Sequence, residues 1–165
     1  MKRLAADRWL CPLTAWASNV SPIVTPIFAW EPGDPEPNYG AIAYQARVRW
    51  DGNPVRKTTV YAASTKLLDL FGLPKRPHLK LHQATHDLGC NQMYWFASRR
   101  WPHLDYVGED LFASRGHGVG VEDAQLCDGN RVVYVLEHAG AYRMDRVRHL
   151  HNHVAIERGL PYFLF

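Results

Sequence analysis

The sequence is 165 residues long, 47% of its residues are hydrophobic, and its formal net charge is +3. This length predicts one domain, or one core with a small appendage, and the hydrophobic share allows a sizeable buried core. No apolar run approaches the roughly 20 residues of a membrane span, so we expect no membrane partner. A mildly basic net charge does not identify a nucleic-acid-binding protein, and only local clustering of charge can do so.

Cysteine usage and the first residues of the chain bear on its compartment. Cys11, Cys90 and Cys127 form no Cys-x-x-Cys pair, and an odd, scattered set argues against a disulfide framework. The opening residues, MKRLAADRWLCPL, lack the long apolar core of a secretory signal. We therefore expect a cytoplasmic protein.

Residues 1–40 are predicted to form a Pro-rich, largely irregular arm. Five prolines between residues 22 and 37 exclude a long helix across this stretch. A short helical turn is expected over residues 5–10, and an edge strand or extended segment over residues 23–30. The arm is also rich in large rings, which suit a contact surface for a protein partner; these are Trp9, Trp16 and Trp30.

Residues 41–77 predict a β-hairpin followed by a short helix, a wing-like unit. Residues 43–50 alternate in part between apolar and polar side chains, and the sequence Asp51-Gly52-Asn53-Pro54 is a strong turn signal. Ser64 is a suitable N-cap for a helix over residues 65–71. Four cations on the expected ribbon suit either phosphate contact or a solvated outer strand; they are Arg47, Arg49, Arg56 and Lys57.

Residues 78–165 predict the main core, in the order helix (79–100), three strands (104–113, 119–126 and 131–137), helix, strand. The run 131–137 is almost entirely apolar, which is typical of a central strand buried on both faces. Apolar residues recur at helical spacing over residues 143–157, and an apolar strand follows at 160–165. The predicted fold class is α/β, with α+β as an alternative, and consists of a mixed β-sheet flanked by helices.

Two acidic residues are expected at one end of this sheet. Asp123 lies late in one strand and Glu137 ends the next, and the two strands are joined by an Asp-Gly turn. Two converging carboxylates can hold Mg²⁺, which can activate water and stabilise charge on a phosphodiester. Glu122 is a further candidate ligand of such a metal.

The arrangement resembles the PD-(D/E)xK nuclease-like superfamily, and residues 58–165 look like the replication-relaxation family of mobile-element proteins. The resemblance rests on His86-Asp87-Leu88, on Asp123, on the apolar strand ending at Glu137, and on the helix and strand that follow. It implies a restriction-endonuclease-like core, DNA as the partner, and an accessory role in plasmid, phage or integrative-element replication or mobilisation.

One departure from the nuclease pattern bears on catalysis. The pattern has Lys two residues after the second acid, but the sequence here is Glu137-His138-Ala139, so the group that would orient water and stabilise negative charge is missing. Arg143 or Arg146 could replace it from the next helix. We therefore expect an inactive core without a cofactor. The alternative is a Mg²⁺-dependent endonuclease that uses the two acids and one of these arginines as catalytic residues.

Two other interpretations remain open. His149-Leu150-His151 matches the His-hydrophobic-His signature of HUH endonucleases, in which both histidines lie on a strand. The helical spacing of residues 143–157 argues against that strand; on a helix, His149 and His153 would share a face with Arg146 and could contact phosphate. Besides the DNA-binding accessory protein and the endonuclease, a third candidate function is a protein-interaction module, such as a phage-encoded inhibitor of host defence. It would bind its partner through the aromatic arm.

Overall fold

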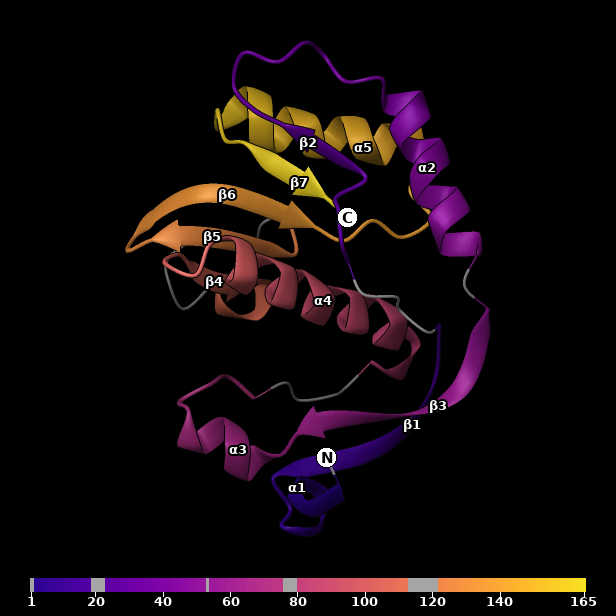
Figure 1. Cartoon of the computed structure of the whole chain (residues 1–165), viewed down its shortest axis with the longest axis vertical. Coiled ribbons are helices and arrows are strands. Elements are labelled where there is room, and N and C mark those ends of the chain that lie inside the picture. Colours follow the sequence, from indigo (N-terminus) through magenta and orange to yellow (C-terminus); the bar gives the residue numbers. More distant parts are fainter. Residues whose placement is uncertain (1, 19–22, 53, 76–79, 113–121) are drawn as a thin grey trace. The chain divides into compact units, whose positions relative to one another are not determined.

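A computed structural model describes residues 2–18, 23–52, 54–75, 80–112 and 122–165 (Figure 1). The chain packs into two units, and neither is a continuous segment. Of the described residues, unit 1 contains 2–18, 54–75 and 80–87, and unit 2 contains 23–52, 88–112 and 122–165. These limits differ from the expected divisions at residues 40 and 77. The two strands of unit 1 that pair with each other are separated in the sequence by a segment of unit 2.

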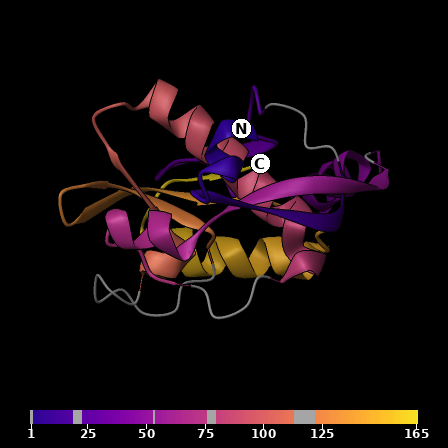
Figure 2. The ribbon, with the colours of Figure 1, turned by 90° about the horizontal axis from the view of Figure 1, so that it is seen from below.

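Unit 1 is an antiparallel two-stranded ribbon with short helices. It consists of α1 (Lys2–Ala6), β1 (Leu10–Ser18), β3 (Val55–Ala63), α3 (Thr65–Leu70) and η1 (Leu81–Gln83), and it includes the start of α4 (Ala84–Arg100). Strands β1 and β3 pair along their whole length (Figure 2). The predicted cap of α3 is confirmed, because Ser64 Oγ accepts a hydrogen bond from the Leu67 N–H at 3.3 Å.

Unit 2 is built on a mixed five-stranded sheet with the order β2-β7-β6-β5-β4. The strands are β2 (Phe28–Trp30), β4 (Asp105–Gly108), β5 (Ala124–Asp128), β6 (Arg131–Glu137) and β7 (Tyr162–Leu164). Among the described strands, β6 and β7 are parallel neighbours and the other pairs are antiparallel. The predicted mixed sheet is therefore present, with the apolar run 131–137 at its centre and β2 at its edge.

Helices cover both faces of this sheet (Figure 1). On one face lie α2 (Tyr39–Asp51) and α5 (Met144–His151), which continues as the π-helix η4 (Asn152–Glu157); α4 lies on the other. Successive residues of the central strands divide between the two cores: Val135 and Tyr162 join the α2 and α5 side, whereas Leu136 packs with α4. Among the described residues, no helix has the combined length and apolar character needed to cross a membrane.

The hairpin expected over residues 41–62 is wrong, because its first half is helix α2. Asn38 caps this helix, its Oδ1 accepting a hydrogen bond from the Ala41 N–H at 3.0 Å. A stripe at helical spacing is buried, and it consists of Tyr39, Ile42, Ala43 and Ala46. The turn signal after residue 50 ends the helix instead: the Gly52 N–H bonds to the Val48 carbonyl at 3.1 Å.

The expected ribbon of four cations is therefore also wrong. Arg47 and Arg49 lie on α2 in unit 2, whereas Arg56 and Lys57 lie on β3 in unit 1. The true partner of β3 is β1, in the region expected to be irregular. Strand β1 tolerates Pro12 because each strand of a two-stranded ribbon has an unpaired edge.

The C-terminal elements agree closely with the sequence. Helix α5 and η4 together cover residues 144–157 of the predicted range 143–157, and Gly159 follows them at φ +64°. The strand predicted over 104–113 is shorter, since β4 is followed by the 3₁₀-helix η2 (Glu109–Leu111). The strand predicted from residue 119 begins at Ala124 among the described residues, and residues 113–121 lie outside them.

Gly89 is the point at which α4 approaches the residue that follows β6. A Cβ atom added there would overlap the buried imidazole of His138. We predict that Gly89→Ala lowers the free energy of unfolding by about 1–3 kcal/mol, because this overlap outweighs the gain of about 1 kcal/mol in helix propensity. Urea denaturation would measure the change.

The matched control is Gly40→Ala in the first turn of α2, where the nearest atom to the new Cβ lies at 3.6 Å. This variant should be as stable as the native protein or slightly more so. Adding His138→Ala to Gly89→Ala should recover part of the lost stability. A Gly89→Ala protein that unfolds at the native urea concentration would contradict the predicted overlap.

Candidate functional site

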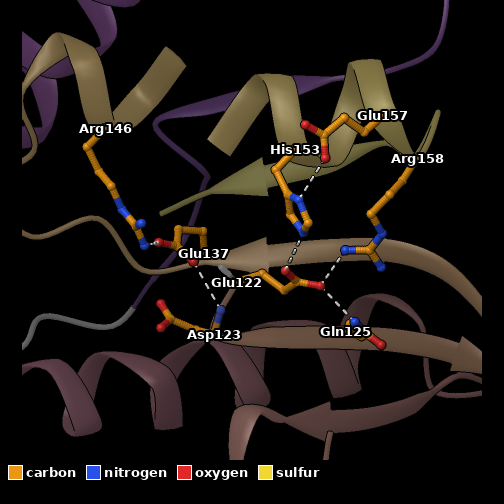
Figure 3. Close-up of polar contacts among 8 residues, drawn as sticks. All are labelled: Glu122, Asp123, Gln125, Glu137, Arg146, His153, Glu157 and Arg158. Carbon is orange, nitrogen blue, oxygen red and sulfur yellow. Dashed lines mark hydrogen bonds and ion pairs between the residues drawn. The ribbon is translucent and has the colours of Figure 1, made fainter. Parts of the chain in front are cut away.

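Asp123 and Glu137 lie next to each other where β5 begins and β6 ends. Ala124 pairs with Leu136 in the antiparallel ladder, so the residues immediately before and after this pair meet. The Asp123 N–H donates a hydrogen bond to Glu137 Oε2 at 3.0 Å (Figure 3). The His138 N–H donates one to Asp123 Oδ2 at 2.7 Å. The structure thus brings the two acids together, as their positions in the sequence indicate.

The carboxyl group of Glu137 is enclosed by protein groups. Its Oε1 accepts a hydrogen bond from Arg146, whose guanidinium nitrogen lies at 3.2 Å (Figure 3). The same oxygen accepts a hydrogen bond from the Tyr142 hydroxyl. Together with the Asp123 N–H, three donors use its two oxygens, and the side chain is fully buried. Glu137 is therefore held as a structural acceptor, and a cation would have to displace these donors.

Burial also changes the ionisation of Glu137. Desolvation and the negative charge of Asp123 raise the pKa of this carboxyl, hydrogen bonds from Tyr142 and the charge of Arg146 lower it, and the net pKa is about 8. The group is thus mostly protonated at neutral pH. Because Mg²⁺ binds ionised carboxylates, Glu137 in this state is a poor magnesium ligand.

Of the two arginines considered as replacements for the missing Lys, only Arg146 reaches the acidic pair. It lies in the first turn of α5 and contacts Glu137, whereas Arg143 is the exposed N-terminal flank of the helix. Ala139, at the position of the missing Lys, is buried, and its N–H bonds to the Phe165 carbonyl at 2.6 Å. The positive charge beside the acids therefore comes from α5.

Glu122 belongs to a different network, so the structure does not group it with Asp123 and Glu137. Its Oε1 accepts hydrogen bonds from Arg158 at 2.6 Å and from Gln125 at 2.7 Å (Figure 3). Burial raises the pKa of Glu122, but these hydrogen bonds more than offset that effect, and the pKa falls below its usual value. Glu122 is an ionised, buried partner that ties the start of β5 to the end of η4.

The histidines of α5 do not form an HUH pair. His149 and His151 lie on a helix and diverge: His149 is exposed, whereas His151 is buried with Nδ1 3.2 Å from the Tyr162 hydroxyl. The HUH interpretation is therefore wrong, since it requires a strand. His153 lies between two carboxylates, with Nδ1 3.1 Å from Glu157 and Nε2 3.8 Å from Glu122 (Figure 3).

The tryptophans of the expected aromatic arm do not share one surface. Trp30 is 8% exposed and belongs to the core of unit 2. In unit 1, Trp9 is half-buried with the Lys66 ammonium 3.7 Å above its ring, whereas Trp16 on β1 is 67% exposed. Trp16 stands directly opposite Lys57 in the ribbon, and neither β1 nor β3 contains an acidic residue.

Comparisons of the chain with protein-family models, with curated proteins and with solved structures found no match. Sequence analysis did not identify Tyr142, Gln125 or Arg158 as partners of the acidic residues. The spacing of three between Glu122 and Gln125 is the one local signal; the other contacts depend on how α5 packs on the sheet.

We predict that the stability of unit 2 falls as pH rises, and that Glu137 causes part of the fall. The folded state retains a proton that the unfolded chain releases above the usual pKa of about 4.5. This contribution is complete below about 4.5 and is lost as pH approaches about 8, with a slope of up to about 1.4 kcal/mol per pH unit. Glu137→Gln, which mimics the protonated acid, should flatten the slope in urea titrations across this window.

Glu31→Gln is the matched control, since Glu31 is exposed in the same unit and makes the same change from acid to amide. Its stability should follow the native pH dependence. Parallel curves for the native protein and Glu137→Gln would show that Glu137 is ionised throughout the window, contrary to this prediction.

A separate prediction concerns the ion pair of Glu122 and Arg158. Glu122→Ala should lower the free energy of unfolding by about 3 kcal/mol, the low end of the range for a buried pair, because the Arg158 side chain is 26% exposed. Arg158→Ala in the Glu122→Ala background should then cost at least about 1 kcal/mol less than in the native protein. Additive losses in this double-mutant cycle would argue against coupling.

Proposed function

We propose that this protein is a DNA-binding accessory protein that contacts phosphates through the β1–β3 ribbon and does not cut DNA. The observation that carries the proposal is the exposed pair Arg56 and Lys57 on a ribbon without acidic residues. Local positive charge of this kind binds the phosphate backbone by releasing counterions. The resemblance of residues 58–165 to the replication-relaxation family motivates a role in plasmid, phage or integrative-element replication or mobilisation.

The surroundings of Glu137 support the absence of cleavage. Its oxygens accept three hydrogen bonds, its pKa is raised, and Ala139 stands where a nuclease of this pattern has Lys. Each feature opposes a Mg²⁺-activated water at this position. A single substitution at Ala139 would not remove the other two obstacles.

A second candidate is a Mg²⁺-dependent endonuclease, favoured by the adjacency of Asp123, Glu137 and Arg146. Asp123 and Glu137 would hold the ion, and Arg146 would stabilise negative charge on the phosphodiester. Mg²⁺ would have to release the proton of Glu137 and displace Tyr142, so this activity would rise with pH.

Binding is tested by fluorescence anisotropy with a labelled DNA at about 50 to 200 mM salt. We predict that Arg56→Ala with Lys57→Ala weakens binding. The slope of log K against log salt should become less steep by about 1.5, since each lost phosphate contact lowers the magnitude of this slope by about 0.7 to 0.9. Arg47→Ala with Arg131→Ala removes the same charge from exposed positions in unit 2 and should have a much smaller effect. Equal effects of the two double variants would contradict binding by the ribbon.

Cleavage is tested in the same preparations with supercoiled plasmid in Mg²⁺, Mn²⁺ or EDTA. We expect no metal-dependent nicking. Nicking that requires the metal and is lost in Glu137→Gln would establish the endonuclease and overturn the inactive assignment. An absence of binding even at low salt would overturn both candidates and leave a protein-interaction module, for which Trp16 is the exposed ring of the N-terminal segment.

A further inference from the structure

We infer that the nucleic acid bound by the β1–β3 ribbon is single-stranded, and that one of its bases stacks on Trp16. This inference rests on the proposed function, because it names the class of nucleic acid that the same ribbon binds. It adds a contact to a base, whereas the proposal above uses phosphates alone.

One face of the ribbon carries the side chains that such a ligand requires. Side chains two residues apart on a strand share a face, and cross-strand partners point the same way. Trp16 is therefore on the same face as its partner Lys57, and the next pair on that face is Thr14 with Thr59. All four residues are exposed. A ring, a cation and two hydroxyls thus lie together on an open surface.

The opposite face of β1 differs, because Ala15 and Ala17 are buried there. Burial therefore alternates along the strand, and Trp16 stands on the side that unit 1 leaves open. An indole that is 67% exposed leaves much of its apolar surface in water. Tyr61, two pairs beyond Lys57 on the same face, adds a second, half-buried ring.

These features favour a nucleic-acid strand over an apolar protein partner. Single-strand-binding surfaces combine positive charge that follows the backbone with aromatic side chains on which bases stack. Here the ring has a cation directly across the ladder, and no carboxylate lies on either strand. Lys57 thus gives this face a positive charge complementary to phosphate, whereas Arg56, the partner of Ala17, lies on the other face of the ribbon.

An unpaired strand suits this face better than a duplex. The faces of the bases in a duplex are covered by stacking on one another, and inserting a side chain between them costs a few kcal/mol per step. The bases of a single strand can turn outward onto an aromatic platform. An indole standing on the open face of the ribbon can therefore reach such a base without that cost.

The test compares a labelled oligo(dT) with a duplex of equal length, at one salt concentration, by fluorescence anisotropy. We expect tighter binding of the single strand. Trp16→Ala should weaken oligo(dT) binding by about 5- to 150-fold, the equivalent of about 1–3 kcal/mol for one stacked base, and Trp16→Phe should retain most of the affinity. Thermal unfolding should be unchanged, because the side chain is exposed.

Trp95→Ala is the matched control, since Trp95 is 56% exposed on α4 in unit 2, and it should bind oligo(dT) as the native protein does. An abasic strand of equal length should bind the native protein and Trp16→Ala equally. These results together would support stacking on Trp16 and not a general loss of aromatic surface.

Two failures can be told apart. If Arg56→Ala with Lys57→Ala reduces binding but the duplex binds as tightly as oligo(dT), or Trp16→Ala has no effect, the single-strand inference is overturned and the proposed function stands. If Arg56→Ala with Lys57→Ala changes no binding, or no nucleic acid binds at low salt, the proposed function is overturned and this inference with it.

Discussion

The buried carboxyl group of Glu137 joins three segments of unit 2. It accepts hydrogen bonds from the start of β5 through Asp123, from the loop after β6 through Tyr142, and from α5 through Arg146. Because a buried acceptor without donors is costly, these contacts fix where α5 begins relative to the sheet. The position of the α2 and α5 core, and of the Glu122 and Arg158 pair at the other end of the helix, depends on that placement.

The same environment decides what chemistry Glu137 can perform. Two carboxylates at a sheet end form a metal site only if both can ionise and keep open coordination positions. Here desolvation and the charge of Asp123 favour the protonated form of Glu137, and protein donors occupy its oxygens. Spacing in the sequence therefore identifies the pair of acids, whereas their function depends on donors contributed by Tyr142 and α5.

Local patterns predicted the parts of the fold that local sequence determines. The apolar run of β6, the stripe of α5 and the cap at Ser64 were read directly from neighbouring residues. Helix α2 is not predicted because two of the four residues of its buried stripe are alanines, and the partial alternation over residues 43–50 resembles a strand in a short window. The pairing of β1 with β3 was missed because a helix and more than 30 residues separate the two strands, and no local period reports such a partner. The convergence of Asp123 and Glu137 was predictable, since a single hairpin joins them.

The exposed cations and the paired acids lie in different units of the chain. The cations Arg56 and Lys57 lie with Trp16 on the ribbon formed by β1 and β3, in unit 1. The acids Asp123 and Glu137 lie in unit 2 and are held by contacts within that unit. The side chains of the proposed phosphate contact are therefore separate from the carboxylates at the sheet end. A binding role without cleavage is consistent with both features. The cations of the ribbon are exposed to a ligand, whereas the acids of unit 2 hold the fold together through hydrogen bonds.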